Sequence, residues 1–301
     1  MPLPGAGEAL IEIRAAGVNP SDVKNVSGHF SATTLPRTPG RDFAGIVVEG
    51  RALSPGAEVW GSAPGFGIGR DGMHAEYAIV PEEILCRKPH NLGFEQMAAV
   101  GVPFTTAWAA LVRAGRIERG ETILIVGARG AVGQAAVQIA HWKGARVVGA
   151  ARGAAPIPGA DAAVDASSAG MRDRVLDLTG GEGADLVLDT VGGPMFEPSL
   201  RSLRHGGRHI AMASTGGRRV DFDLVDFYHN ESRLVGFDSQ AFTPGDAGRI
   251  AHLLLEGFES GALKPPEVEV TPFRDAVTVY EKIAAGKAPR KQILTFARSG
   301  S

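Results

Sequence analysis

The chain has 301 residues, enough for two domains, and its 44% hydrophobic and 21% charged residues are typical of a globular protein. A formal net charge of −2 gives no electrostatic reason to expect nucleic acid or an anionic membrane as a partner, and no apolar run approaches the length of a membrane span. The single cysteine, Cys86, excludes an intrachain disulfide, and a start that lacks a basic segment followed by an apolar one predicts a cytoplasmic protein.

Residues 1–95 contain short strand-like runs that are broken by glycine and proline. The clearest are "ALIEIRAAGV", "DFAGIVVEG", "AEVWG" and "HAEYAIVP". Strands this short, with frequent turn signals between them, predict a β-rich, barrel-like domain.

Residues 96–239 alternate strands and helices, which predicts parallel βαβ units and a Rossmann-type doubly wound sheet. Apolar strands such as "TILIV", "ARVVGAA", "DLVLD" and "RHIAMAS" are separated by helical patterns such as "MRDRVLDLTG" and "MFEPSLRSLR". One crossover is an exception, because residues 153–158 contain both Pro156 and Pro158. Two prolines in six residues disfavour a helix, so we expect a loop-like crossover after the second strand.

Residues 240–301 form the last zone. The pattern predicts a helix at "DAGRIAHLLLEGFESG", a proline-rich turn at "LKPPEVEV", a helix at "FRDAVTVYEKIAAG" and a strand at "KQILTF". We expect this segment to return to the first domain, which is then discontinuous over 1–95 and 240–301.

The segment "ILIVGARGAVGQAAVQIA", residues 123–140, joins a buried strand to a helix through a glycine-rich turn. Free backbone N–H groups and the positive end of the helix dipole meet in such a turn, and a pyrophosphate satisfies both. Gly130 would let the backbone approach the phosphates and Gly133 would let helix and strand pack closely, although Ala128 occupies the usual first-glycine place. The alternative is a tight turn with no ligand.

The end of the second strand indicates which dinucleotide is bound. NAD sites tend to carry an acidic residue there, whereas this strand contains none and is followed by Arg152. An arginine pairs with the 2′-phosphate of NADP, and Arg129 inside the turn is a second candidate for that contact. The sequence therefore favours NADP over NAD, with a solvated surface arginine as the alternative for Arg152.

Several motifs resemble one known family. They are "AAGVNPSDVKNVSG", "PGRDFAGIVVEG", "HAEYAIVP", "TAWAAL", the glycine turn, "GADLVLDTVGG", "SLRSLRHGGRHI" and "DAVTVYEKIAAGKAPRKQIL". In this order they resemble the medium-chain dehydrogenase/reductase superfamily, and within it the zinc-independent quinone oxidoreductases of the zeta-crystallin-like branch. The resemblance implies a GroES-like catalytic domain, a Rossmann domain, a cofactor between the two and a homodimer.

The same resemblance bears on zinc. Alcohol dehydrogenases of the superfamily carry a catalytic cysteine where this chain has Asn19, and a His-Glu pair where it has Arg41 and Asp42. Asparagine and arginine are not useful zinc ligands, so we expect no metal. Without a Lewis acid the acceptor must take hydride unaided, as a quinone or another conjugated carbonyl does.

The resemblance also assigns residues to the site. Asn19 and Thr106 lie near the nicotinamide, and the cofactor-binding positions are Gly130, Ala131, Val132, Gly133, Arg152, Asp189, Thr190, Val191, Ala213, Ser214, Phe237, Asp238 and Ser239. Arg129 is added to them from its place inside the glycine turn. Asn19, Asp189 and Ser214 have the alternative of capping a turn or helix. Lys24 stands where a tyrosine is common, and it either holds the acceptor carbonyl or is solvated.

These residues predict an NADPH-dependent reductase of quinones or related α,β-unsaturated carbonyls, acting on a small-molecule substrate. One alternative is an enoyl-thioester reductase, in which Arg290 and Lys291 either hold a carrier phosphate or form an ordinary solvated pair. Another is a non-catalytic NADPH-binding sensor or structural protein. We expect His74 at the surface and Cys86 as a small buried residue rather than a nucleophile.

Overall fold

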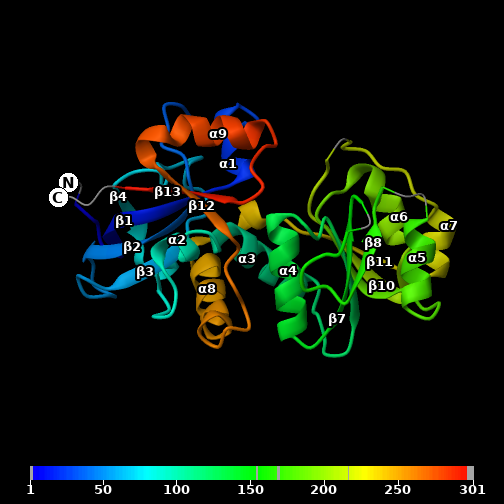
Figure 1. Cartoon of the computed structure of the whole chain (residues 1–301). Coiled ribbons are helices and arrows are strands. Elements are labelled where there is room, and N and C mark those ends of the chain that lie inside the picture. Colours follow the sequence, from blue (N-terminus) through cyan, green and yellow to red (C-terminus); the bar gives the residue numbers. More distant parts are fainter. Residues whose placement is uncertain (1–2, 154, 168–169, 216, 297–301) are drawn as a thin grey trace. The chain divides into compact units, whose positions relative to one another are not determined.

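The computed structural model describes residues 3–153, 155–167, 170–215 and 217–296. Contacts divide the chain into two compact units (Figure 1). Unit 1 comprises Met1–Thr105 and Gln240–Ser301, and unit 2 comprises Thr106–Ser239. The C-terminal segment therefore belongs to the same unit as the N-terminal one. The first boundary between the units follows Thr105, about ten residues after the boundary near residue 95 that the sequence predicted.

Unit 1 is built on a mostly antiparallel sheet in the order β12-β13-β1-β2-β3-β5, with β4 paired to β1. Its strands are β1 (Glu8–Val18), β2 (Asp42–Glu49), β3 (Glu58–Ser62), β4 (Tyr77–Pro81), β5 (Cys86–Arg87), β12 (Val268–Pro272) and β13 (Lys291–Thr295). The long β1 pairs with β2 and β13, so that Gly17 faces Asp42 on one side and Val18 faces Gln292 on the other. This pairing brings the ends of three distant chain segments together. The prolines of "LKPPEVEV" end before Val268, and a strand follows where the sequence predicted only a turn.

The helices of unit 1 are α1 (Pro20–Val26), α2 (Phe94–Met97), α8 (Pro244–Glu259) and α9 (Ala276–Ala284). α3 (Gly101–Trp108) crosses the division between the units and continues as a π-helical turn over Ala109–Ala114. Short 3₁₀ turns occur at Glu82–Ile84, Ser239–Ala241 and Phe273–Asp275. The short α1 begins with Asn19 as N-cap and Pro20 in the first turn, and the Asn19 backbone N–H donates to Asp22 Oδ2 over 2.8 Å.

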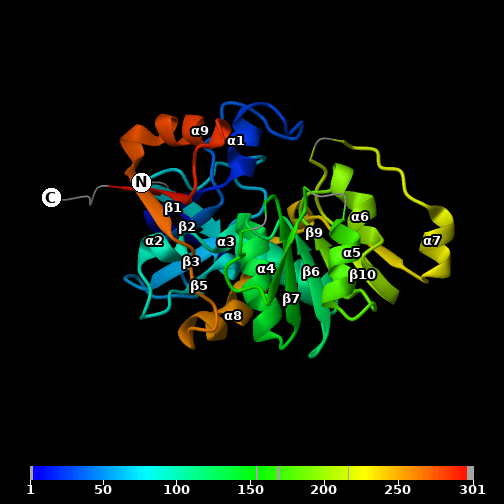
Figure 2. The ribbon, with the colours of Figure 1, turned by 45° about the vertical axis from the view of Figure 1, so that its right-hand side comes forward.

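Unit 2 is a six-stranded parallel sheet in the order β11-β10-β9-β6-β7-β8, which confirms the Rossmann-type fold (Figure 2). Its strands are β6 (Thr122–Val126), β7 (Arg146–Ala151), β8 (Ala162–Asp165), β9 (Ala184–Asp189), β10 (Leu203–Ala211) and β11 (Arg233–Gly236). Its helices are α4 (Ala131–Trp142), α5 (Met171–Leu178), α6 (Phe196–Leu200) and α7 (Leu224–His229), with a 3₁₀ turn at Gly193–Met195. The strand order reverses between β6 and β9, and ligands of such sheets bind at the carboxyl ends beside that point.

The crossover from β7 to β8 contains no helix over residues 153 and 155–161, as the two prolines predicted; Ala154 lies outside the described residues. The segment is nevertheless anchored. Ile157 is buried against Gly149, and Asp161 Oδ2 accepts the Val147 N–H at 2.7 Å. None of the helices within the described ranges is both long and apolar enough to cross a membrane.

Candidate functional site

The turn after β6 is shaped by two glycines that no other residue could replace without a shift of backbone or side chains. Gly127 has φ +81°, and a Cβ there would overlap Thr190 Oγ1. A Cβ on Gly133 would overlap the Gly127 carbonyl oxygen and lie 2.7 Å from Ala128 Cα. Gly133 therefore has the predicted role of close helix–strand packing. Gly127, one residue before the place occupied by Ala128, supplies the conformational freedom of the usual first glycine.

The start of α4 leaves backbone donors free. Gly127 N–H and Ala128 N–H both donate to Ala150 O, at 2.9 and 3.1 Å, which fixes the turn on β7. The described residues offer no hydrogen-bond acceptor to the N–H groups at the first three positions of the helix, Ala131, Val132 and Gly133. These donors coincide with the positive end of the α4 dipole, an arrangement suited to a phosphate.

The turn opens onto a hollow of about 1140 Å³ within unit 2. It is lined by Val126, Gly127, Arg129, Gly130, Ala151, Arg152, Gly153, Ala166, Ser167, Thr190, Val191, Pro194, Met195 and Thr215. Five residues predicted from the sequence are among them, namely Arg129, Gly130, Arg152, Thr190 and Val191. The hollow follows the carboxyl ends of β6, β7, β8 and β9, where parallel sheets bind ligands.

The two arginines beside the hollow differ in what their guanidinium groups do. Arg129 donates to the Arg152 carbonyl oxygen at 2.5 Å and also to the Ala155 carbonyl oxygen, so its side chain holds the crossover segment to the turn. Arg152 is exposed and lines the hollow directly after β7. Of the two, only Arg129 is shown to bond to the loop, and Arg152 lies at the rim of the hollow where β7 ends.

Ser167 belongs to the lining but was missed by sequence reasoning. It follows β8, and Asp165 Oδ1 accepts hydrogen bonds from its hydroxyl at 2.6 Å and from Gly153 N–H at 2.9 Å. These hydrogen bonds lower the pKa of the Asp165 carboxyl, the side-chain bond from Ser167 most of all. A signal was present in the run "DASS" directly after a strand, because strand ends carry the ligand-facing loops of such a sheet.

Asp189, at the end of β9, is turned inward. Its Oδ1 accepts the N–H groups of Val191 and Gly192 at 2.9 and 2.8 Å, and the side chain is almost fully buried. Burial raises the pKa of this carboxyl, against the effect of the two backbone bonds. Thr190 Oγ1 donates to Val126 O at 2.7 Å. Asp189 thus shapes the loop, whereas Thr190 and Val191 face the hollow.

Later strand ends contribute less than expected. Ala213, Ser214 and Asp238 are exposed and Phe237 and Ser239 are partly buried, and none of the five lines the hollow. The Ser214 hydroxyl donates to Gly217 O, consistent with a turn-capping role. Thr215 lines the hollow instead, and its N–H donates to Val191 O at 2.7 Å.

In unit 1, Asn19 lies in a buried polar cluster. Its side chain is 3% exposed; Nδ2 donates to Asp42 Oδ2 at 2.8 Å, and Oδ1 accepts from Lys291 Nζ at 2.5 Å. Lys24 is exposed on α1. Thr106 is buried in the part of α3 that belongs to unit 2. The cluster therefore joins Asn19 to Lys291, which the sequence analysis expected either to bind a carrier phosphate or to be solvated.

Lys291 is neither a solvated residue nor part of a basic rim, and both expectations for it were wrong. Its side chain is 7% exposed, and its Nζ lies 3.6 Å from Asp42 Oδ2. Burial lowers the pKa of Lys291, and the neighbouring carboxylates of Asp42 and Asp22 oppose that shift. Arg290, by contrast, is exposed and pairs with Glu267 at 3.2 Å. Strand pairing of β13 with β1 draws the lysine inside.

The residues at the superfamily's zinc positions do not fit zinc. Asn19 and Asp42 bond to each other and to Lys291, and Arg41 is a cation whose Nε donates to Asp22 Oδ1 at 3.1 Å. Positive side chains thus hold the oxygen atoms that a metal would need. Within the described ranges, no group of three or more His, Cys, Asp or Glu residues is placed to hold a metal ion.

Two further expectations have clear outcomes. His74 is 3% exposed, not at the surface; its Nε2 donates to Gly17 O at 3.2 Å and its Nδ1 accepts from the Tyr280 hydroxyl at 2.9 Å. Burial lowers its pKa. Cys86 is fully buried, and burial raises the pKa of its thiol to about 12, which confirms a packing residue.

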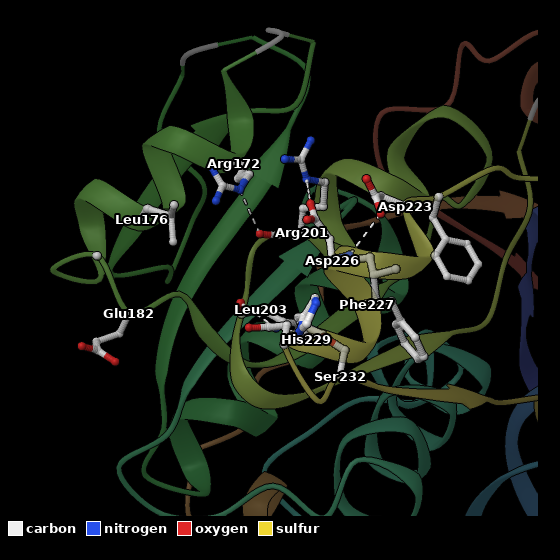
Figure 3. A pocket seen from close by; sticks show the side chains of 14 residues that line it. Arg172, Leu176, Glu182, Arg201, Leu203, Asp223, Asp226, Phe227, His229 and Ser232 are labelled. Carbon is white, nitrogen blue, oxygen red and sulfur yellow. Dashed lines mark hydrogen bonds and ion pairs between the residues drawn. The ribbon is translucent and has the colours of Figure 1, made fainter.

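A second hollow of unit 2, of about 380 Å³, is formed by residues of α5, α6 and α7, by Leu203 at the start of β10 and by loop residues around them (Figure 3). Four of its charged side chains bind one another or nearby backbone groups. Arg172 Nε donates to Arg201 O at 3.2 Å, and Arg201 pairs with Asp226 at 3.2 Å. Asp223 accepts the N–H of Val225 at 2.8 Å as the N-cap of α7. These pairs account for the arginines and aspartates of the hollow without a ligand.

Two family models match the chain. The alcohol dehydrogenase GroES-like domain matches residues 5–90, and the zinc-binding dehydrogenase domain matches residues 131–253. A zinc-type alcohol dehydrogenase-like protein of Schizosaccharomyces pombe is 38% identical over 88% of this chain and 80% of its own length. The quinone oxidoreductase of Homo sapiens is 31% identical over 98% of this chain and 91% of its own length.

Solved structures agree with these matches. A mycobacterial quinone oxidoreductase superimposes with a TM-score of 0.86 at 27% identity, covering 98% of this chain and 93% of the other. The CurK enoyl reductase gives a TM-score of 0.81 at 25% identity, covering 99% of this chain and 93% of the other. With the GroES-like and Rossmann units described above, these similarities establish that the chain belongs to the medium-chain dehydrogenase/reductase superfamily, in its quinone oxidoreductase-like branch.

Proposed function

We propose that this oxidoreductase transfers hydride from NADPH to a quinone or a related α,β-unsaturated carbonyl. The observation that carries the proposal is the hollow at the start of α4, where free N–H donors and Arg152 lie together and β7 ends without a carboxylate. A dinucleotide with a 2′-phosphate matches both features.

The protein's own groups would hold the cofactor in the following way. The N–H groups of Val132 and Gly133 would bind the pyrophosphate, and Arg152 would pair with the 2′-phosphate. Thr190 and Val191 would limit the depth of the hollow beside the cofactor. Bound NADPH supplies the hydride, and the protein contributes binding, orientation and electrostatics.

The acceptor is proposed to be a carbonyl compound whose reduced form is already stabilised by conjugation. The Asn19–Asp42–Lys291 cluster already contains a positive side chain and does not suit zinc. No Lewis acid would therefore be available to stabilise the alkoxide of a simple alcohol. We propose that Asn19 donates a hydrogen bond to the acceptor oxygen. Water or the exposed Lys24 would supply the proton to that oxygen.

The test begins with the purified full chain. A saturating concentration of NADPH should raise its melting temperature, and NADPH oxidation should then be followed with a panel of quinones and with crotonyl-thioester. A higher turnover rate with quinones than with crotonyl-thioester supports the proposal. A higher rate with crotonyl-thioester supports the enoyl-thioester alternative, which the similarity to an enoyl reductase also favours. Binding without any turnover would support the sensor alternative, and no binding of NADPH would refute all three.

Independence from zinc is proposed on the same residues. Metal analysis of the purified chain by mass spectrometry should find far less than one zinc per chain, and dialysis against a chelator should leave NADPH oxidation unchanged. One tightly held zinc per chain, lost together with activity, would refute this mechanism.

A further inference from the structure

Lys291 and Asn19 are 272 positions apart in the sequence but meet at the end of β1. Asn19 follows β1 directly and Lys291 is the first residue of β13, and the antiparallel register pairs Val18 with Gln292. Lys291 Nζ donates to Asn19 Oδ1 at 2.5 Å. Both side chains are buried, so solvent does not compete for this hydrogen bond.

The two neighbours of the Asn19 amide determine which way it points. The amino group of Lys291 donates and the carboxylate of Asp42 accepts, so the amide oxygen must face Lys291 and the amide nitrogen must face Asp42. A flipped amide would set nitrogen against nitrogen and oxygen against oxygen, and both Lys291 Nζ and Asp42 Oδ2 would lose their hydrogen bonds to Asn19.

Asp42 is itself held in place, which makes it a fixed reference for the amide. Its Oδ1 accepts from Ser62 Oγ at 2.9 Å and from the Val102 N–H at 2.7 Å. A Cβ at position 101 would overlap Asp42 Oδ1, so Gly101 is what lets the start of α3 approach the carboxylate. The other carboxylate oxygen of Asp42, Oδ2, faces Asn19 and Lys291.

We propose that Lys291 and Asp42 are positioning residues that hold Asn19 as a hydrogen-bond donor toward the acceptor's carbonyl oxygen. One Nδ2 proton goes to Asp42, and the described residues provide no acceptor for the other. A ligand group at Asn19 must therefore be an acceptor of hydrogen bonds. This inference rests on the proposed function, because the carbonyl oxygen gains negative charge as hydride arrives and the bond from Asn19 strengthens in the transition state.

The test compares three variants of the full chain. Lys291→Met removes the donor that holds the amide oxygen. The pair Lys291→Met with Asp42→Asn removes both buried charges together, so that no unpaired ion is left to unfold the protein. In this paired variant, the hydrogen bonds from Ser62 and Val102 hold the amide oxygen of the new asparagine at position 42. The amide nitrogen of that asparagine then faces Asn19. Because a nitrogen donates, the Asn19 amide should turn over so that its oxygen accepts this bond.

A matched control is Lys88→Met. Lys88 is a second buried lysine of unit 1, 6% exposed, whose Nζ bonds Leu92 O at 2.7 Å and Glu58 at 3.0 Å, away from Asn19. The two Lys291 variants should lower kcat for the acceptor about tenfold, the effect of about one well-placed hydrogen bond, with KM for NADPH unchanged. Lys88→Met should leave kcat unchanged. Equal kcat values in folded wild-type and paired-variant protein would overturn the proposal.

A spectroscopic readout separates this inference from the proposed function. In ¹⁵N-labelled protein, the side-chain amide signals of Asn19, assigned from their loss in Asn19→Ala, should shift in both Lys291 variants and stay in place in Lys88→Met. Unchanged Asn19 signals in the paired variant would show that Lys291 and Asp42 do not hold the Asn19 amide, whatever the activity. If the Asn19 signals shift as expected but the wild-type protein reduces no carbonyl acceptor, the proposed function is refuted, together with the donor role of Asn19 that depends on it.

Discussion

At the scale of single residues, the two arginines beside the hollow should separate in their effect on cofactor choice. Arg152→Ala should weaken NADPH binding by about tenfold or more, the loss of about one charge-assisted pair, and leave NADH binding nearly unchanged. Arg129→Ala is the matched control. Arg129 bonds backbone carbonyls of the crossover segment, so its loss should weaken NADPH and NADH by similar factors. Titration calorimetry with both nucleotides measures this; equal losses in Arg152→Ala would contradict the assignment.

His209 gives a residue-scale prediction on pH. It is fully buried, its Nε2 lies 3.1 Å from Ser199 Oγ, and burial lowers its pKa to about 4, from about 6.5 in the unfolded chain. The neutral ring is therefore not ion-paired with Asp189 near neutral pH, although the two lie 3.7 Å apart.

The unfolded chain takes up a proton at His209 below about pH 6.5 and the folded chain does not until about pH 4, so the folded state loses stability as pH falls between these values. By pH 5 the loss from this group is about 2 kcal/mol. Urea unfolding at pH 7.5 and pH 5 should show a smaller pH dependence in His209→Gln than in wild type. The same dependence in both proteins would show that His209 titrates normally.

At the scale of elements, the strand–turn–helix unit from β6 to α4 requires a glycine at position 133. Gly133→Val places side-chain atoms where the Gly127 carbonyl lies, so it should remove binding of both nucleotides and lower the melting temperature. Gly130→Ala is the informative comparison. Its φ of −72° suits any residue, and the nearest atom to a new Cβ is Gly127 O at 3.2 Å.

Gly130→Ala should therefore keep a near-normal melting temperature while weakening both nucleotides, because only a bound phosphate would meet the new methyl group. Differential scanning calorimetry and equilibrium binding check the pair of variants. Full nucleotide affinity in Gly130→Ala would show that the phosphates do not approach this turn.

At the scale of the whole molecule, the homodimer expected from the resemblance stays a prediction, and unit 2 offers a surface for it. Leu224, Val225, Tyr228 and Leu234 on α7 and β11 are 44% to 62% exposed. Within the described residues β11 pairs only with β10, so its other edge is open to a strand of a second copy.

Light scattering after size exclusion should give twice the 31.3 kDa of one chain, and Leu234→Asp should shift the protein toward the monomer. Leu253→Asp is a control, since Leu253 lies on α8 of unit 1 and is 49% exposed, against 44% for Leu234. A monomeric wild type at micromolar concentration, or a Leu234→Asp protein that stays dimeric, would argue against this surface.

The sequence by itself determined whatever depends on local chemistry. The apolar strands, the glycine turn and the paired prolines Pro156 and Pro158 were enough to predict the parallel sheet, the start of α4 and the crossover without a helix over its described residues. Each of these features is set by steric and hydrogen-bonding preferences within a few residues of chain. The place of Arg152 at the hollow followed in the same way, because the end of a strand fixes which residue comes next.

Only the tertiary structure decided the surroundings of the unit 1 residues. Nothing near Lys291 in the sequence shows that it is buried against Asn19 and Asp42, and nothing near His74 shows that Tyr280 covers it. Both contacts depend on how the segment after residue 240 packs with β1 and α1, over separations of more than 200 residues. A side chain's charge and solvation are set by what the fold brings beside it, and that information lies in long-range pairing rather than in the neighbouring residues.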